Sequence, residues 1–191
     1  MSSNTQGKAE IYRAPQDFKQ GKARLWFELL HHAHYFAYCY TFWLLLPKNS
    51  YPFIGVLFPI GWLGYGILET LLREETKYFN VWALSVGHLL SAAAILIMAL
   101  TNSVSLIIVM WFLTGLGGGT AYMLSNVPPA GDREAFEDVG HVSGCLVAGA
   151  SIWITADARS SLWAGAILAL AAASVIVMRK APGTSGQMEM G

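Results

Sequence analysis

The sequence Trp111-Phe-Leu-Thr-Gly-Leu-Gly-Gly-Gly-Thr-Ala-Tyr-Met-Leu-Ser-Asn126 decides which fold this chain can adopt. Its four glycines, at positions 115, 117, 118 and 119, lie in an apolar segment that begins at Val104. In water, each glycine would cost a helix about 1 kcal/mol relative to alanine. In a bilayer, small residues one turn apart let two helix backbones approach closely. The stretch therefore predicts a membrane helix packed tightly inside a bundle, with Gly115 and Gly119 at the contact.

The composition of the whole chain points the same way. Of its 191 residues, 54% are hydrophobic and only 13% are charged, which is about half the charged share of a usual soluble domain. Lipid offers the backbone no hydrogen-bond partners, and the sequence lacks the alternating pattern of a barrel, so the predicted fold is all-α. Six apolar segments have about the length needed to cross a bilayer: Arg24–Leu46, Pro52–Leu72, Val81–Leu100, Val104–Asn126, His141–Ala156 and Leu162–Met178.

The basic residues predict how these six transmembrane helices are oriented. Lys and Arg gather before the first segment and after the second, fourth and sixth, whereas only Lys48 and Arg159 lie on the other side. The excess of basic residues marks the cytoplasmic side, so both termini are expected there. This gives a cytoplasmic tail over 1–23, a six-helix membrane domain over 24–180 and a second tail over 181–191. A multi-pass protein of a bacterial inner or intracytoplasmic membrane is expected.

The first apolar segment is the most polar of the six. It carries Glu28, His31, His32, His34, Tyr35, Tyr38 and Thr41. Ionisable groups at membrane depth usually face a bundle interior or a water-filled cavity. Spacings of three and four place on one helical face His31, His34 or Tyr35, Tyr38, and Thr41 or Phe42. Glu28, one turn before His31 and His32, can hold either ring by a hydrogen bond. The alternative for His31 and His32 is a place at the membrane interface.

Histidine also allows a cofactor. His88, in the third segment, is expected near the depth of His34, and two helical histidines can be the axial ligands of a haem or bind a (bacterio)chlorophyll. His31 and His34 can alternatively help to bind a metal ion. A histidine inside a helix is more often satisfied by a nearby carbonyl or carboxylate, so no cofactor is assigned. Cys39 and Cys145 are interpreted as small buried residues and not as a disulfide.

The later segments add packing residues and one acidic cluster. Gly144 and Ala148, four residues apart in the fifth segment, predict another close helix contact. The cluster from Asp132 to Asp138 is interpreted as a solvated loop, and His141 opens the segment that follows. Motifs of known enzyme sites are absent from the sequence, which disfavours an enzyme. The net charge of zero gives nucleic-acid binding no support.

The order of these features resembles one half of a major facilitator superfamily transporter. The segment Phe112–Gly119 looks like the glycine motif of that family's fourth helix, and the segment from His34 to Pro47 is similar to first helices of several drug-resistance members. Two features depart from the family. Trp111 stands where many proton-coupled members carry arginine, and Thr70 replaces the aspartate of the signature after the second helix. The second six-helix half is also missing.

Two functions follow from this resemblance, and both need a partner. The interpretation we favour is a scaffold subunit of a larger membrane complex, in contact with lipid and with other membrane subunits. The alternative is a small-solute transporter working as a homodimer or as a paired half-transporter. Its titratable group would be His34 or Glu28. Its expected cavity-lining residues are His34, Tyr38, Thr41, Tyr65, Thr114 and Tyr122.

Overall fold

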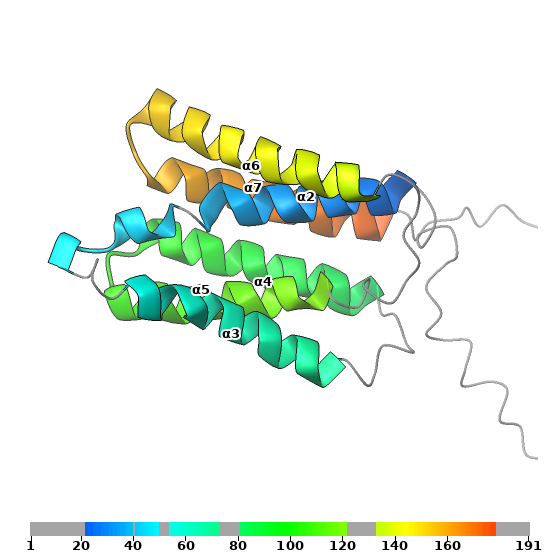
Figure 1. Ribbon diagram of the computed structural model, residues 1–191, viewed down its shortest axis with the longest axis horizontal. Helices are drawn as coiled ribbons and strands as arrows, with labels where there is room; N and C mark the ends of the chain where they lie inside the picture. The colour runs from blue at the N-terminus through cyan, green and yellow to red at the C-terminus, as the bar shows by residue number, and fades with distance from the viewer. Residues whose placement is uncertain (1–21, 40, 50–53, 73–80, 122–132, 179–191) are drawn as a thin grey trace, which may run out of the picture.

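The protein is a bundle of helices in which the chain runs back and forth along one direction (Figure 1). The computed structural model describes residues 22–39, 41–49, 54–72, 81–121 and 133–178. These residues form six α-helices, one short 3₁₀ helix and no strand. The elements are α2 (Lys22–Tyr38), η2 (Phe42–Leu45), α3 (Ile54–Leu72), α4 (Val81–Leu100), α5 (Val104–Gly119), α6 (Arg133–Thr155) and α7 (Arg159–Met178).

The predicted all-α class is confirmed, and each apolar segment contains one of the α-helices. The limits differ at three places. The first helix ends at Tyr38 and gives way to η2, and the fourth ends at Gly119, so that 122–126 lie outside the described residues. The interpretation of the acidic cluster as a loop is wrong from Arg133 onward, because α6 begins there, eight residues before His141.

The helices form two layers. One layer contains α2, α6 and α7, the other contains α3, α4 and α5, and α4 packs against α7 between them (Figure 1). Most helix contacts are related by an exchange of α2, α3 and α4 with α5, α6 and α7. The contact of α2 with α6 corresponds to that of α5 with α3, and the contact of α2 with α7 corresponds to that of α5 with α4, whereas the contact of α6 with α7 has no extensive counterpart between α3 and α4. Since α2 begins at the end where α5 stops, the two three-helix units are inverted relative to each other.

Glycine makes the closest helix contacts. A Cβ atom on Gly115 of α5 would overlap the carbonyl oxygen of Gly61 on α3, and one on Gly144 of α6 would overlap that of Ala33 on α2. A Cβ on Gly119 would lie 3.0 Å from the Tyr65 carbonyl oxygen. The packing predicted for these three glycines is what the structure has. Ala148 is 5% exposed on the same helix as Gly144.

The outside of the bundle is apolar along most of its length. Large hydrophobic side chains are exposed on every α-helix, among them Trp153 at 86% and Leu146 at 66%. Two helices, Trp82–Leu100 and Arg159–Val177, are long and apolar enough to cross a membrane, and Val104–Gly119 is apolar but shorter. A water-soluble monomer rarely exposes apolar surface on this scale.

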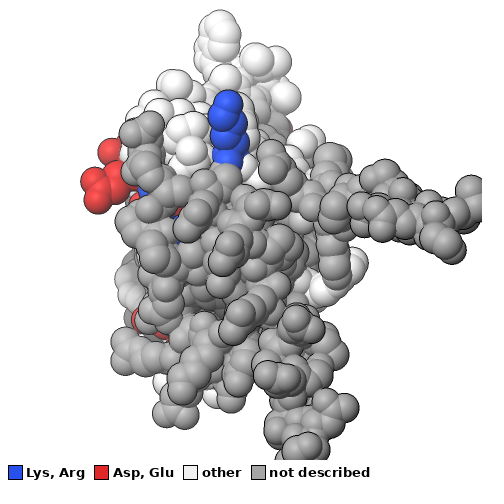
Figure 2. All heavy atoms as spheres, turned by 90° about the vertical axis from the view of Figure 1, so that its right-hand side faces the viewer, with Lys and Arg blue, Asp and Glu red and all other residues white. Residues whose placement is uncertain are grey.

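Charged side chains lie only near the two ends of the described bundle. At the end where α2 and α6 begin are Lys22, Arg24, Glu28, Glu69, Arg133, Glu134, Glu137 and Asp138. Figure 2 looks onto this end and shows acidic and basic side chains there. Lys48, Asp157 and Arg159 lie at the opposite end, where Arg159 donates a hydrogen bond to Asn102. The segment between the two charged ends is therefore uncharged.

Candidate functional site

A cavity of about 420 Å³ lies between the two layers. Its wall is built from α2 and α5, with α3 and α6 on either side, so the first two helices of each three-helix unit contribute to it. The volume is in the range of small-molecule sites in proteins. The lining residues are His31, His32, Tyr35, Phe36, Cys39, Phe58, Gly61, Trp62, Tyr65, Trp111, Thr114, Gly115, Gly118 and His141.

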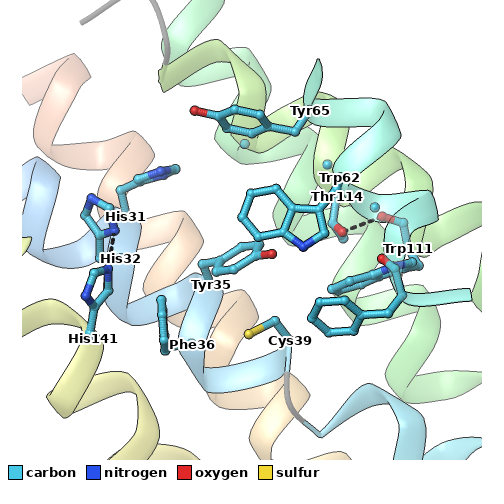
Figure 3. Close-up of a pocket in the computed structure, with 14 residues that line it drawn as sticks. His31, His32, Tyr35, Phe36, Cys39, Trp62, Tyr65, Trp111, Thr114 and His141 are labelled. Carbon is cyan, nitrogen blue, oxygen red and sulfur yellow. Dashed lines mark hydrogen bonds between the residues drawn. The ribbon is translucent and has the colours of Figure 1, made fainter. Parts of the chain in front are cut away.

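One side of the cavity carries imidazole rings (Figure 3). His32 on α2 and His141 on α6 are joined by a hydrogen bond of 2.8 Å between Nδ1 of His32 and Nε2 of His141. Phe36 packs on His141, with ring centroids 4.2 Å apart. This pair links α2 to α6 beside the cavity and leaves part of both rings accessible.

The other side of the cavity is aromatic. Trp111 stacks on Phe42, with ring centroids 4.2 Å apart and planes at 11°, and its indole nitrogen donates a hydrogen bond of 3.0 Å to the Phe58 carbonyl. Trp62 and Tyr65 of α3 complete this side (Figure 3). An aromatic wall with few polar groups suits a small, largely apolar solute.

An ion-pair network links α2 and α6 at the charged end of the bundle. Glu28, which is 3% exposed, lies 3.5 Å from Nε of Arg24 and 3.4 Å from Nε of Arg133. Arg133 also pairs with Glu137 one turn further along α6. Nε2 of His32 is 3.9 Å from a carboxylate oxygen of Glu28 and 4.0 Å from one of Glu137. The distance to Glu28 is too long for the hydrogen bond predicted between Glu28 and His32. Two arginines thus balance the charge of two buried or half-buried carboxylates.

Of the residues expected to line a cavity, Tyr65 and Thr114 do so. His34, Tyr38 and Thr41 are buried nearby but are not among the lining residues. Thr41 instead faces α7, with its hydroxyl 2.6 Å from that of Ser161. Tyr122 lies outside the described residues.

Three histidines gather behind the cavity wall. Nδ1 of His31 lies 2.9 Å from Nε2 of His88, and the ring centroid of His34 is 5.3 Å from that of His31 and 5.4 Å from that of His88. His34 and His88 are fully buried, whereas His31 also lines the cavity. The similar depth predicted for His34 and His88 is thus found, and His31 joins them.

The arrangement leaves no slot for a haem or a chlorophyll between His34 and His88. An axial pair needs a flat macrocycle between its two rings. Here the rings of His31, His34 and His88 pack against one another in a triangle, with centroids 5.1 to 5.4 Å apart, and the Phe27 ring lies 4.9 Å from His88. The geometry therefore disfavours a bis-histidine macrocycle at this place.

Sequence patterns alone do not connect α2 with the start of α6. Arg133, Glu137 and His141 are about a hundred positions from Glu28 and His32, and the sequence predicts a solvated loop for the charged residues before His141. The spacing of these three residues by four was the available signal, because it places them on one helical face. Neither cysteine forms a disulfide. Cys39 is buried at the cavity, as predicted, whereas the prediction of a buried residue is wrong for Cys145, because it lies on the exposed side of α6.

Comparisons with protein-family models, with curated proteins and with solved structures found no match to this chain.

Proposed function

We propose that the chain is a half-transporter, a bundle of six membrane-crossing helices that carries a small, largely apolar solute together with a second six-helix half. The observation that carries the proposal is the cavity between the layers. Its wall comes from the first helix of each inverted unit, and α3 and α6 on either side of it share no extensive contact among the described residues. A second half covering this side would enclose the solute.

Six membrane crossings are supported by the distribution of charge and apolar surface. The described helices begin and end near one of two charged ends, and the segment between these ends exposes apolar side chains on each helix. In water these side chains would drive aggregation, whereas in lipid they need no cover. The proposed orientation, with both termini in the cytoplasm of a bacterial inner or intracytoplasmic membrane, rests on the excess of basic residues.

The relationship to the major facilitator superfamily remains part of the proposal. Support comes from the exchange of helix contacts between α2–α4 and α5–α7, because transporters of that kind nest two inverted three-helix units within each half. The partner we propose is a second copy of this chain, since a symmetric pair is the commonest way to complete a membrane assembly from one kind of subunit.

A transport assay in vesicles tests the proposal. Purified protein in liposomes should exchange one of a panel of radiolabelled small aromatic solutes, and Trp62→Ala, which removes part of the aromatic wall, should slow the exchange by about tenfold or more. Trp153→Ala is the matched control, because Trp153 is 86% exposed and far along α6 from the cavity. Equal rates in empty and protein-containing vesicles for every solute would contradict transport.

The second candidate function is that of a scaffold subunit in a membrane complex. It is favoured by the outer face of α6, where Val142, Leu146 and Trp153 are at least 60% exposed and form a continuous apolar surface for another protein. Purification from native membranes in a mild detergent separates the two candidates. A stoichiometric complex with different subunits supports the scaffold, and a homodimer supports the half-transporter.

A further inference from the structure

We infer that His31, His34 and His88 form a binding site for a divalent late first-row transition metal, of which Zn²⁺ is the best-suited example. One ligand atom from each ring lies within 4.8 Å of the other two. The site is built by α2, which supplies His31 and His34 one turn apart, and by α4, which supplies His88. It is independent of the proposed transport of an organic solute.

The distances fit a small metal ion. In a tetrahedral zinc site with nitrogen ligands about 2.0 to 2.1 Å from the ion, two ligand atoms are about 3.3 Å apart. The 2.9 Å between His31 Nδ1 and His88 Nε2 is slightly shorter than this, so a small opening of the pair would admit the ion. Because His31 and His34 lie three residues apart on one helix, their rings already converge, with centroids 5.3 Å apart.

The weak pairing of His34 is a second observation in favour of a metal site. This side chain is fully buried, and its ring nitrogens make no hydrogen bond of ordinary geometry within the described part of the chain, although the ring lies near the backbone of Leu30 and His31. A buried imidazole with such weak partners is costly in an apolar bundle. A metal ion would supply a stronger partner, since neutral imidazole is the form that binds it.

His88 is already oriented as a metal ligand. Its Nδ1 lies 2.8 Å from the Leu84 carbonyl oxygen, one turn earlier on α4. A carbonyl can only accept, so Nδ1 carries the proton and Nε2 keeps its lone pair toward His31. This carbonyl–histidine arrangement is the usual support of a metal-binding histidine, because it fixes the ring and its tautomer.

The ligand set selects the class of ion. No carboxylate or cysteine belongs to the three-histidine cluster among the described residues, so Mg²⁺ and Ca²⁺, which need oxygen ligands, are excluded. Imidazole ligands suit zinc, copper, nickel and cobalt. Three protein ligands leave a fourth position for water or a solute, and His31, which borders the cavity, gives the ion a path of entry.

The nearby group of Glu28, His32 and Glu137 also brings three potential ligands together. It differs from the three-histidine cluster because Arg24 and Arg133 already balance its carboxylates. A cation there would have to displace a guanidinium. Because of this difference, we assign the metal site to the three-histidine cluster and not to the group around Glu28.

Cobalt titration of the full-length protein tests the inference. Protein purified in mild detergent and freed of metal by a chelator is titrated with Co²⁺, whose visible absorption is intense only in tetrahedral or similar low-coordinate sites. The expected result is saturation at about one ion per chain, displaced by Zn²⁺. His34→Ala and His88→Ala should weaken binding at least about tenfold.

His141→Asn is the matched control, since it removes a histidine from the same region without touching the cluster, and it should keep full Co²⁺ binding. His34→Gln, which keeps most of the side-chain volume, replaces His34→Ala if the alanine variant does not fold. As a second measurement, Zn²⁺ should raise the unfolding temperature of the native chain and leave that of His34→Gln unchanged. Absence of binding in the native chain, or equal binding in the His34 and His88 variants, would overturn the inference.

Discussion

At the scale of single residues, the closest helix contacts of this bundle are made at glycines, which have no side chain. Gly61 and Gly115 let α3 and α5 touch through their backbones, and Gly144 does the same for α6 on α2. In the proposed membrane setting, helices gain little from hydrophobic association, so close backbone contact and van der Waals packing would hold them together. Glycines at these contacts are therefore stabilising, although the same residues would weaken a helix in water.

Gly115→Leu should destabilise the bundle, because its side chain would overlap the Gly61 backbone and force α3 away from α5. Overpacking of this kind costs about 1–3 kcal/mol. The matched control is Gly118→Ala, since a Cβ at Gly118 meets nothing within 4 Å. Unfolding of both variants in mixed detergent micelles measures the difference, and equal stability would contradict the close contact.

The carboxylate of Glu28 gives a second prediction at this scale. Glu28→Gln leaves the buried Arg24 beside Arg133 without the anion between them. Removing one partner of a buried ion pair costs about 3–5 kcal/mol. Glu134→Gln is the control, because Glu134 is exposed one residue from Arg133, and it should change the free energy of unfolding little. A thermal unfolding series in detergent compares the two variants.

At the scale of helices, hydropathy was enough to locate α4 and α7 within two or three residues, since long apolar runs leave few alternatives. Hydropathy did not predict two other helix limits. No change in hydropathy marks the end of α2 and the start of η2 after Tyr38. The start of α6 is polar, because its first turns pair with α2. Pairing between distant segments is a tertiary property, so a single sequence does not contain it in a local pattern.

The same limit applied to the candidate site. The sequence predicts His34 and His88 at one depth, but the contact of His31 with both rings depends on how α2 rotates against α4. Thr114 could be expected at a cavity because the resemblance implies that the fourth helix lines it, whereas Tyr65 lies on the second segment, for which the resemblance gives no such reason. The turn of α2 that carries His34 and Tyr38 faces inward behind the wall, and that rotation is fixed by Gly140 and Gly144 on α6.

The contact between α2 and α6 yields an element-scale prediction. Gly144→Val should push α6 from α2, break the hydrogen bond between His32 and His141 and open the cavity toward Cys39. In a background of Cys145→Ser, the thiol of Cys39 should then react faster with a small maleimide. Gly149→Ala is the control, because nothing lies within 4 Å of a Cβ there. An unchanged labelling rate in Gly144→Val would speak against this packing.

At the scale of the whole molecule, the proposed six crossings predict which residues lie on each side of the membrane. Asn102 and Asp157 are exposed at one end of the bundle, and Glu134 is exposed at the other. In a background of Cys39→Ser and Cys145→Ser, Asn102→Cys and Asp157→Cys should react with an impermeant maleimide only from outside the cell. Glu134→Cys should react only from the cytoplasmic side. Labelling of all three from one side would rule out the six-span arrangement.

The inversion that relates the two three-helix units has a consequence for directionality. The exchange of helix contacts relates the two ends of the bundle only approximately, because α6 packs on α7 whereas α3 and α4 share no extensive contact among the described residues. If the proposed transport is right, the two ends would then differ both in helix packing and in side chains. The ion pairs of Glu28, Arg133 and Glu137 have no counterpart at the opposite end of the described bundle, so the proposed carrier would meet a charged network at one end alone.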